Sequence, residues 1–520
     1  MEWPYGAFLY CVRIIQWKPS TKQIPQGLWS CGVDEWRFRA HLRRRPRGKP
    51  HFSRIAPLNG QVPRILISAP RKSSGKTMVS IGLTAAFASR GLKVGTFKKG
   101  LDYIDPRWLG VAGGRECHNL DFFVMGREGI QRNFHRYSQE IELALIEGNM
   151  GLFDGQEMDG SDSGAALAKA LDCPILLVVN CQGMARSVAP LVLGHLDFPG
   201  GEQIGGVILN NVATPRQEDK LRRVLEQYSR VPVLGVLPRS SEVVIDERHL
   251  GLVPVGEKES LASRVTAIGQ HVARHLDLDQ ILDLAKGAGA YSWPGASNSP
   301  VLPVATPPKV RIAIATDQAF SFYYPENLAA LRAAGAELIP FSFLKDSALP
   351  PVDGLYIGGG FPEMFMESLS ANRALMGQIK GAVEAGFPVY AECGGLMVLA
   401  EKIHWEGRAA QMVGALPIEV EMNRRPQGYG YMEIAGTGAL PWPGKDKKIR
   451  CHEFHYSQVV KGADKVKFAY RVERGSGVDG VRDGLIYRNV LASYAHIHVD
   501  GAPQWATFLV NFWQRGVGVT

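Results

Sequence analysis

Short apolar segments alternate with amphipathic helical stretches from Arg64 onward, and this alternation most limits what the chain can fold into. Several segments are nearly continuous apolar runs, which indicates strands that are buried on both faces of a mainly parallel sheet. The sequence therefore predicts an α/β fold. The strands expected in the first half are Ile65–Ala69, Leu92–Phe97, Ala144–Glu147, Ile175–Val179, Gly206–Leu209 and Val233–Val236.

A change of composition divides the chain into two halves. Residues 285–308 are rich in Gly, Ala, Ser and Pro and carry one charge, which is typical of an exposed linker. We expect an α/β domain on each side of it, at 63–284 and 309–520. In the second domain we expect strands at Val310–Ala315, Gly354–Ile357 and Val389–Ala391, and a helix from Glu326 to Ala334 that Gly335 ends.

The positive charge of the chain lies almost entirely at its front. The formal net charge of the 520 residues is +9, but residues 1–60 hold 11 Lys and Arg against 3 Asp and Glu. We expect residues 1–62 to be a basic leader, either disordered or a misassigned start. A nearly neutral body argues against nucleic acid as a partner, and no apolar run is long enough to span a membrane. Seven scattered cysteines favour a reducing cytoplasm.

A phosphate-binding loop is predicted directly after the first strand. The run is Ser73-Ser74-Gly75-Lys76-Thr77, followed by a helical stretch. In a P-loop, backbone N–H groups point at phosphate oxygens, the lysine meets the terminal phosphates and the hydroxyl holds Mg²⁺. Lys76 and Thr77 stand where those roles require. Pro70 replaces the first glycine of the consensus, so an ordinary strand-to-helix turn remains the alternative.

Carboxylates follow the ends of two strands of the first half. In open parallel sheets, ligands sit at the carboxyl ends of the strands, so these acids are expected in the same crevice as the P-loop. Mg²⁺ is bound by one or two carboxylates together with phosphates. We expect Glu147 to be its first carboxylate ligand, with Asp102 or Asp105 second. The fourth acid of this group is Asp154.

A second reactive group is predicted where a strand of the second half ends. Cys393 follows Val389–Ala391 and precedes two glycines, which resembles a sharp turn that exposes a nucleophile. Backbone N–H groups of Gly394 and of a second glycine run, which includes Gly359 and Gly360, are candidates for an oxyanion hole. The alternative is a buried structural cysteine. The histidines that could activate the thiol are His452, His455, His496 and His498.

Together these motifs resemble the cobyrinate a,c-diamide synthase family of glutamine-dependent amidotransferases. The resemblance covers about seven-eighths of the chain. It implies an ATP-binding amidoligase domain akin to dethiobiotin synthetase and a C-terminal class I-like glutaminase domain of the triad type. The motifs are, in order, SSGKT, DYIDP, NLD, EGNMGLFDG, DQAFSFYYPEN, GGGFPE, AECGG, HEFHYS and SYAHIH.

The resemblance also implies roles for individual residues. Cys393 would be the glutaminase nucleophile and His496, rather than His498, its activating histidine. The family's positions near ATP, metal and the reacting carboxylate correspond to Asp102, Tyr103, Asp105, Glu147 and Asp154, with Asn211 as a contact to the nucleotide base. The implied cofactors are ATP and Mg²⁺, and the implied substrates are L-glutamine and the acetate side chains, at positions a and c, of a tetrapyrrole.

One departure bears on the acceptor. Leu101 follows Gly100 where the family commonly has proline, and Lys98-Lys99 precede it. This pattern is similar to that of siroheme amidases, so siroheme or sirohydrochlorin is an alternative acceptor for the same chemistry. A partitioning-type P-loop ATPase without ligase activity is a further alternative, although it leaves Cys393 without a purpose. A homodimer is compatible with the sequence.

Overall fold

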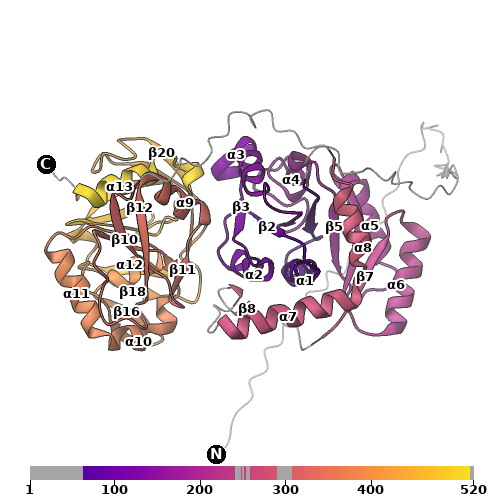
Figure 1. The fold of residues 1–520 in the computed structure, drawn as a ribbon, viewed down its shortest axis with the longest axis horizontal. Helices are drawn as coiled ribbons and strands as arrows, with labels where there is room; N and C mark the ends of the chain where they lie inside the picture. Colours follow the sequence, from indigo (N-terminus) through magenta and orange to yellow (C-terminus); the bar gives the residue numbers. More distant parts are fainter. Residues whose placement is uncertain (1–61, 241–246, 249–250, 253–257, 290–306, 516–520) are drawn as a thin grey trace, which may run out of the picture. The chain divides into compact units, whose positions relative to one another are not determined.

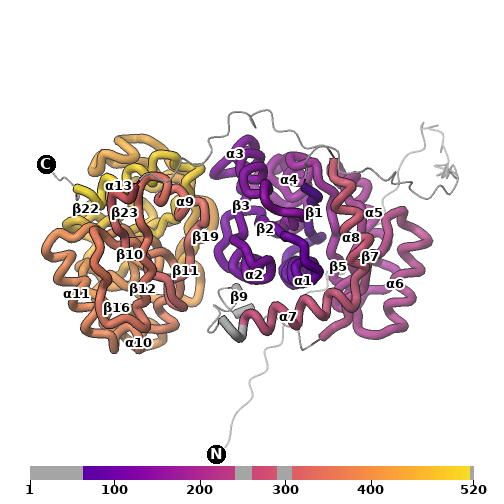
Figure 2. Tube along the Cα trace, viewed as in Figure 1, coloured from indigo at the N-terminus to yellow at the C-terminus, as the bar shows by residue number. Residues whose placement is uncertain are grey.

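The computed structural model describes residues 62–240, 247–248, 251–252, 258–289 and 307–515. The basic leader expected at 1–62 lies, except for Val62, outside the described residues, as does most of the linker expected at 285–308. Within the described ranges, helix α8 (Leu278–Lys286) continues two residues into the expected linker. Residues Ile55–Thr520 form one compact unit, in which each α/β half comes from a contiguous stretch of chain (Figures 1 and 2).

The first half is built on a parallel sheet of seven strands, which confirms the expected fold class. All six strands expected from apolar runs are present, and a seventh, β3, lies at one edge. Central strands such as β1 are buried along their whole length, as two-sided burial requires. In spatial order the strands are β3 (Cys117–Leu120), β2 (Val94–Lys99), β4 (Leu143–Glu147), β1 (Arg64–Ser68), β5 (Ile175–Asn180), β6 (Ile204–Val212) and β7 (Val233–Pro238).

Helices cover both faces of this sheet because its strands alternate their apolar side chains between two cores (Figure 1). Ile65 and Ile67 face one core with α1 and α7, whereas Leu66 faces the other with α3 and α4. The remaining elements of this half are the hairpin β8 (Glu247–Arg248) and β9 (Gly251–Leu252), and the helices α1 (Lys76–Ser89), α2 (Ile104–Gly113), α3 (Phe122–Tyr137), α4 (Gly164–Leu171), α5 (Val188–Asp197), α6 (Pro215–Tyr228) and α7 (Lys258–His275).

The second half contains a mixed sheet of nine strands. Its parallel part includes the three expected strands and runs β12 (Ala336–Phe341), β10 (Val310–Ala315), β13 (Gly354–Ile357), β15 (Val389–Glu392) and β24 (Val490–Ser493). An antiparallel part, not expected from the sequence, continues it with β23 (Arg482–Tyr487), β22 (Lys467–Arg474), β19 (Gly428–Gly436) and β20 (Lys448–His455).

Helices and two small sheets complete this half. The helix expected up to Ala334 is α9 (Pro325–Ala334), and Gly335 ends it with φ 108°. The other helices are α10 (Met366–Ala371), α11 (Arg373–Glu384), α12 (Gly394–Leu399) and α13 (Trp505–Arg515). The small sheets pair β11 (Phe320–Phe322) with β14 (Gly359–Gly360), and β17 (Arg408–Gln411), β16 (Lys402–Trp405), β18 (Glu419–Met422) and β21 (Ser457–Lys461) with one another.

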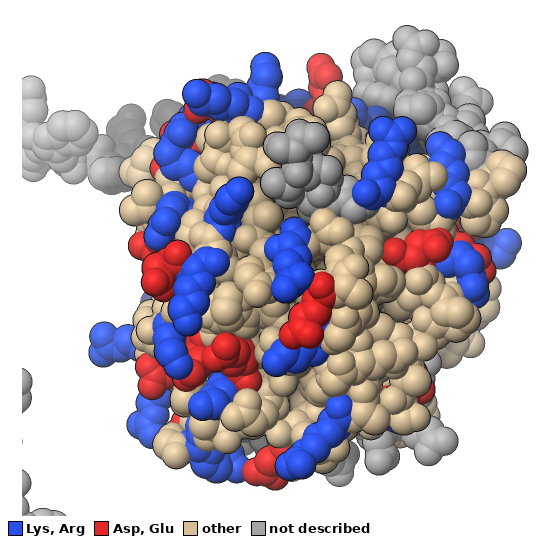
Figure 3. Space-filling model, turned by 90° about the vertical axis from the view of Figure 1, so that its left-hand side faces the viewer, with Lys and Arg blue, Asp and Glu red and all other residues tan. Residues whose placement is uncertain are grey.

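Two further properties bear on partners. Basic and acidic side chains are interspersed on the face shown in Figure 3. No helix in the described part of the chain is both long and apolar enough to cross a membrane.

Candidate active sites

The predicted P-loop connects β1 to α1 as expected. Ser73 and Gly75 both have positive φ, at 56° and 96°, so the loop turns sharply before Lys76 begins the helix. A Cβ at Gly75 would lie 2.1 Å from the side-chain nitrogen of Asn210, so only glycine fits there. Asn210 donates a hydrogen bond to the carbonyl of Ser74 at 2.9 Å and thereby fixes the loop from β6.

Lys76 and Thr77, which are expected at the terminal phosphates, contact residues that follow the ends of neighbouring strands. The Lys76 ammonium donates to the carbonyl of Met150 at 2.6 Å, which brings the EGNMGLFDG loop onto the P-loop. The Thr77 hydroxyl donates to Glu147 Oε1 at 2.7 Å and lies 3.4 Å from Asp105 Oδ2. The three strand ends β1, β2 and β4 thus converge, as the rule for open parallel sheets predicts.

Lys98 occupies the centre of this acidic cluster. Its ammonium lies 2.5 Å from Asp105 Oδ2, 2.8 Å from Glu147 Oε1 and 3.9 Å from Asp102 Oδ2. Burial opposes its charge, but the two nearest carboxylates outweigh burial and raise the pKa of Lys98. The sequence marked Lys98 only as a departure from the family. The signal that it belongs to the site is that a lysine within a fully buried strand needs an acidic partner.

Burial shifts the acids and Lys76 in opposite directions. Burial raises the pKa of Glu147 to about 7, and burial together with the Asp105 charge raises that of Asp102 to about 6. Burial and the charge of Lys98 lower the pKa of Lys76 to about 8. Charges removed from water without full compensation are typical of sites that receive a charged ligand.

The cluster also fits a magnesium ion. Glu147 Oε2 is buried and has no hydrogen-bond partner among the described residues, and the hydroxyl of Thr77 lies beside the same carboxylate. Oxygen donors of this kind, with phosphate oxygens completing the shell, are what Mg²⁺ prefers. No group of three or more His, Cys, Asp and Glu suited to hold a metal occurs among the residues described.

Three further expected residues make local contacts of their own. Asp102 accepts the amide of Ile104 at 2.8 Å and thus stabilises the start of α2. Asp154 is exposed and accepts the amide of Gly151 at 2.8 Å. Asn211, with φ 58°, donates to Asn180 at 3.3 Å. Asn210, which the sequence interpretation did not single out, contacts the P-loop.

Tyr103 contacts residues of both halves within the compact unit. Its ring stacks on Tyr324 with centroids 4.4 Å apart and on Phe322 at 5.1 Å, and it lies 5.1 Å from the ring of His496. Its chain neighbours include Asp105 of the acidic cluster. A single side chain therefore joins the surroundings of the P-loop to those of the expected glutaminase histidine.

Cys393 stands at the expected sharp turn between β15 and α12. Its φ of 50° and ψ of −103° are strained for a residue with a side chain, which is the geometry of a nucleophile elbow. The thiol lies 3.6 Å from the carbonyl oxygen of Phe454. Burial, and next the negative charge of Glu363, raise the pKa of the Cys393 thiol, so the site must be activated by histidine or by substrate.

The three glycines expected at the oxyanion hole lie around this turn. A Cβ on Gly394 would approach the backbone nitrogen of Gly360 to 2.9 Å, and one on Gly359 would approach His496 Cε1 to 2.6 Å. The strand β14 that carries Gly359 and Gly360 is held by pairing with β11. Small residues are therefore required where the backbone, the imidazole and the elbow meet.

The four candidate histidines have different surroundings. His496 is buried, with Nδ1 3.6 Å from Glu392 Oε2. His498 lies between two acids, with Nε2 3.6 Å from Glu326 Oε2 and Nδ1 3.5 Å from Asp500 Oδ2. Burial alone would lower the pKa of His498, but the contact with Glu326 raises it. Burial lowers the pKa of His452 to about 3. The fourth, His455, donates from Nδ1 to the carbonyl oxygen of Ser457 and lines the pocket at the thiol.

Comparisons with known proteins agree with this architecture. A family model described as a CobQ/CobB/MinD/ParA nucleotide binding domain matches residues 65–253, and one described as a CobB/CobQ-like glutamine amidotransferase domain matches residues 311–504. The fold and the two sites thus define an ATP-dependent carbon–nitrogen ligase that takes its nitrogen from glutamine.

Relatives with the same two-domain span identify the family. The cobyrinate a,c-diamide synthase of Magnetococcus marinus is 59% identical over 459 residues, which cover 88% of this chain and 98% of the relative. That of Methanosarcina barkeri is 40% identical over 86% of this chain and 96% of the relative. That of Synechocystis is 39% identical over 84% of this chain and 90% of the relative. The chain belongs to the cobyrinate a,c-diamide synthase family.

Proposed function

We propose that the protein amidates the a and c acetate side chains of cobyrinate, with ATP as the activating nucleotide and glutamine as the nitrogen donor. The observation that carries this is the presence in one compact unit of a P-loop that meets buried acids and of a thiol on a nucleophile elbow. The choice of cobyrinate as the acceptor rests on the names of the relatives described above. We also propose the domain division 63–284 and 309–520, and a cytoplasmic setting, to which the five buried, unpaired cysteines of the described residues are suited.

In the first half, the proposed chemistry is activation of a carboxylate. A carboxylate oxygen of the acceptor attacks the γ-phosphorus of ATP. The bond between this phosphorus and the bridging oxygen breaks, ADP departs, and the acceptor carboxylate becomes an acyl phosphate. Backbone N–H groups of Ser74 and Gly75 and the ammonium of Lys76 hold the phosphates. Thr77 and Glu147, with Asp102 or Asp105, would hold Mg²⁺, which supplies charge neutralisation at the phosphates when bound. Asp154 and Tyr103 are proposed at the acceptor, and Asn211 at the base.

In the second half, the proposed chemistry releases ammonia. The Cys393 sulfur attacks the side-chain amide carbon of glutamine, and His496 takes the thiol proton and gives it to the leaving nitrogen. Backbone N–H groups of Gly359, Gly360 or Gly394 hold the oxyanion. Ammonia then attacks the acyl phosphate, and phosphate departs with the oxygen of the former carboxylate. Water completes the glutaminase cycle by hydrolysing the thioester to glutamate.

The acceptor is tested by mass spectrometry of products from cobyrinate, sirohydrochlorin and siroheme, each incubated with the protein, ATP, Mg²⁺ and glutamine. We expect amide products from cobyrinate, each amide giving the mass change of replacing a hydroxyl group by an amino group. At completion two carboxyl groups should be amidated. Amidation of siroheme or sirohydrochlorin in place of cobyrinate would assign the same chemistry to the alternative acceptor. An incubation without ATP is the control, because the carboxylate is unreactive until it is phosphorylated.

A further inference from the structure

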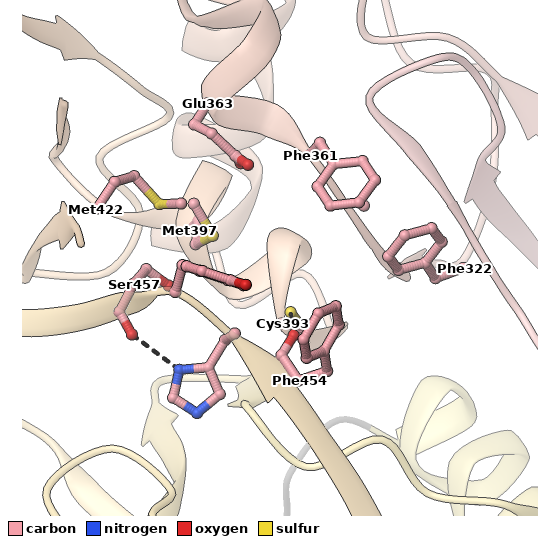
Figure 4. Close-up of a pocket in the computed structure, with 11 residues that line it drawn as sticks. Phe322, Phe361, Glu363, Cys393, Met397, Met422, Phe454 and Ser457 are labelled. Atoms are coloured by element: carbon pink, nitrogen blue, oxygen red, sulfur yellow. Dashed lines mark hydrogen bonds between the residues drawn. The ribbon is translucent and has the colours of Figure 1, made fainter. Parts of the chain in front are cut away.

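A pocket opens beside the Cys393 thiol and contains one carboxylate (Figure 4). It encloses about 300 Å³ that protein atoms do not fill, part of it open to solvent. Its walls are mainly apolar and include Phe361, Met397 and Met422. Figure 4 shows the side chain of Glu363 reaching toward the space between Phe361 and Met397. A charged group in a largely apolar pocket normally fixes the orientation of a ligand.

Glu363 has no cationic partner within the described ranges. Its residue is 4% exposed, and the donor that acts on its carboxylate is its own backbone N–H. It is the acidic residue in the first turn of the short 3₁₀ helix Pro362–Phe365. Burial raises its pKa to about 8, because the charged form is costly to hold without a counter-charge. A cation that enters the pocket would therefore be stabilised by this carboxylate and would favour its charged form.

The histidine that lines the pocket does not pair with Glu363. His455 Nδ1 lies 2.8 Å from the carbonyl oxygen of Ser457, and Nε2 lies 3.4 Å from Glu453. Both nitrogens are thus directed to other acceptors. A cation carried by the molecule that enters the pocket would find the Glu363 carboxylate free to pair with it.

We propose that Glu363 binds the α-ammonium group of glutamine and thereby selects an α-amino acid over other primary amides. This rests on the proposed function, in which the glutamine side-chain amide reaches Cys393. One end of the substrate carries the amide that the thiol attacks, and the other end carries a cation that a buried carboxylate would pair with. The apolar walls exclude water from the methylene groups between them.

The test compares glutamine with glutaramate, which is glutamine without its α-amino group. Ammonia release by the full-length protein is measured for both substrates in wild type, in Glu363→Gln and in Glu367→Gln. The last variant is the control, because Glu367 is exposed on α10 and pairs only with Arg408 at the surface. In Glu363→Gln we expect kcat/KM for glutamine to fall at least about 30-fold, chiefly through KM, as when one partner of a buried charged pair is removed.

The value for glutaramate should change less than about 3-fold in the same variant, because glutaramate never makes the contact. Parallel losses for both substrates would overturn the proposal, because a structural role affects them alike. A wild type that hydrolyses glutaramate as efficiently as glutamine would also overturn it, whether or not the variant folds. Either of these two results would contradict the role of Glu363 without contradicting the hydrolysis of glutamine at Cys393. A wild type that releases no ammonia from glutamine and forms no amide with any donor would instead overturn the proposed function and this inference together.

Discussion

The imidazole of His496 and the carboxylate of Glu392 face each other in the core of the second half, with Nδ1 and Oε2 3.6 Å apart and both side chains 1% exposed. Glu392 directly precedes Cys393, and the Tyr390 hydroxyl donates to its other oxygen at 2.7 Å. His496 Nδ1 has no hydrogen-bond partner in the part of the chain that the structure describes. An acid in this position orients an imidazole and stabilises its protonated form, as the third member of a triad does.

Replacing Glu392 with Gln should therefore lower kcat for glutamine hydrolysis by roughly 10-fold or more, with a smaller change in KM. Steady-state ammonia release at a series of glutamine concentrations measures both parameters. Glu384→Gln, at the exposed end of α11, is the matched control. An unchanged kcat in Glu392→Gln would show that another group orients His496.

Replacing Cys393 with Ala should abolish amidation that depends on glutamine. Amidation driven by ammonium salts at high pH should continue, because free ammonia bypasses the thiol and attacks the activated carboxylate directly. Product formation with each nitrogen donor is measured under the same conditions. Equal loss with both donors would contradict the assignment of Cys393 as the nucleophile. Cys451→Ala, in the buried core of the same half, is a control for the effect of removing a sulfur.

Replacing Lys76 with Ala should remove amidation with either nitrogen donor. The ammonium group neutralises charge that develops on the phosphates, and its loss typically reduces phosphoryl transfer by two or more orders of magnitude, roughly 100-fold or more. Glutamine hydrolysis without acceptor should persist, since the thiol and His496 are untouched. ATP-dependent amide formation at the wild-type rate would disprove the P-loop interpretation. Lys72→Ala is the control, since Lys72 lies exposed in the same loop.

The buried Glu363 predicts a pH dependence of stability. Its pKa is raised by burial from 4.5 in the unfolded chain to about 8 in the folded protein. The folded state therefore holds the proton more tightly, so this contribution to stability is complete below pH 4.5 and is lost as the pH rises through about 8. Compared with wild type, Glu363→Gln should become relatively more stable across that window. Denaturant unfolding at several pH values measures the difference, and a constant difference would contradict the assignment of its pKa.

Much of the parallel architecture could be predicted because two-sided burial leaves continuous apolar runs in the sequence. The runs at β1 and β5 were placed to within one residue, and the elbow at Cys393 followed from the glycines around it. The edge strand β3, with the sequence CHNL, is too short and too polar to stand out by its pattern. The antiparallel strand β20 mixes charged, aromatic and small residues, so its period-two burial became visible only in the fold.

The candidate sites were predictable at the level of motifs but not of side-chain direction. Asn210 reaches the P-loop while Asn211 contacts Asn180, because Asn211 has φ 58° and the strand register shifts between Leu209 and Val212, which a sequence pattern does not show. Lys98 enters the acidic cluster from within a buried strand, and only the three-dimensional pairing of β2 with β4 places it beside Glu147. Glu363 belongs to the GGGFPE motif, but its isolation from cations is a property of the packed pocket.

The central claim is that nitrogen released at Cys393 becomes an amide of an acceptor carboxylate activated at the P-loop. Its most direct test supplies glutamine with an isotopically labelled side-chain amide, together with ATP, Mg²⁺ and cobyrinate, and follows the label by mass spectrometry. The label should appear in the a- and c-amide groups of the product with wild-type protein and be absent with Cys393→Ala. Labelled ammonia released into solution while cobyrinate keeps both carboxylates would contradict the account.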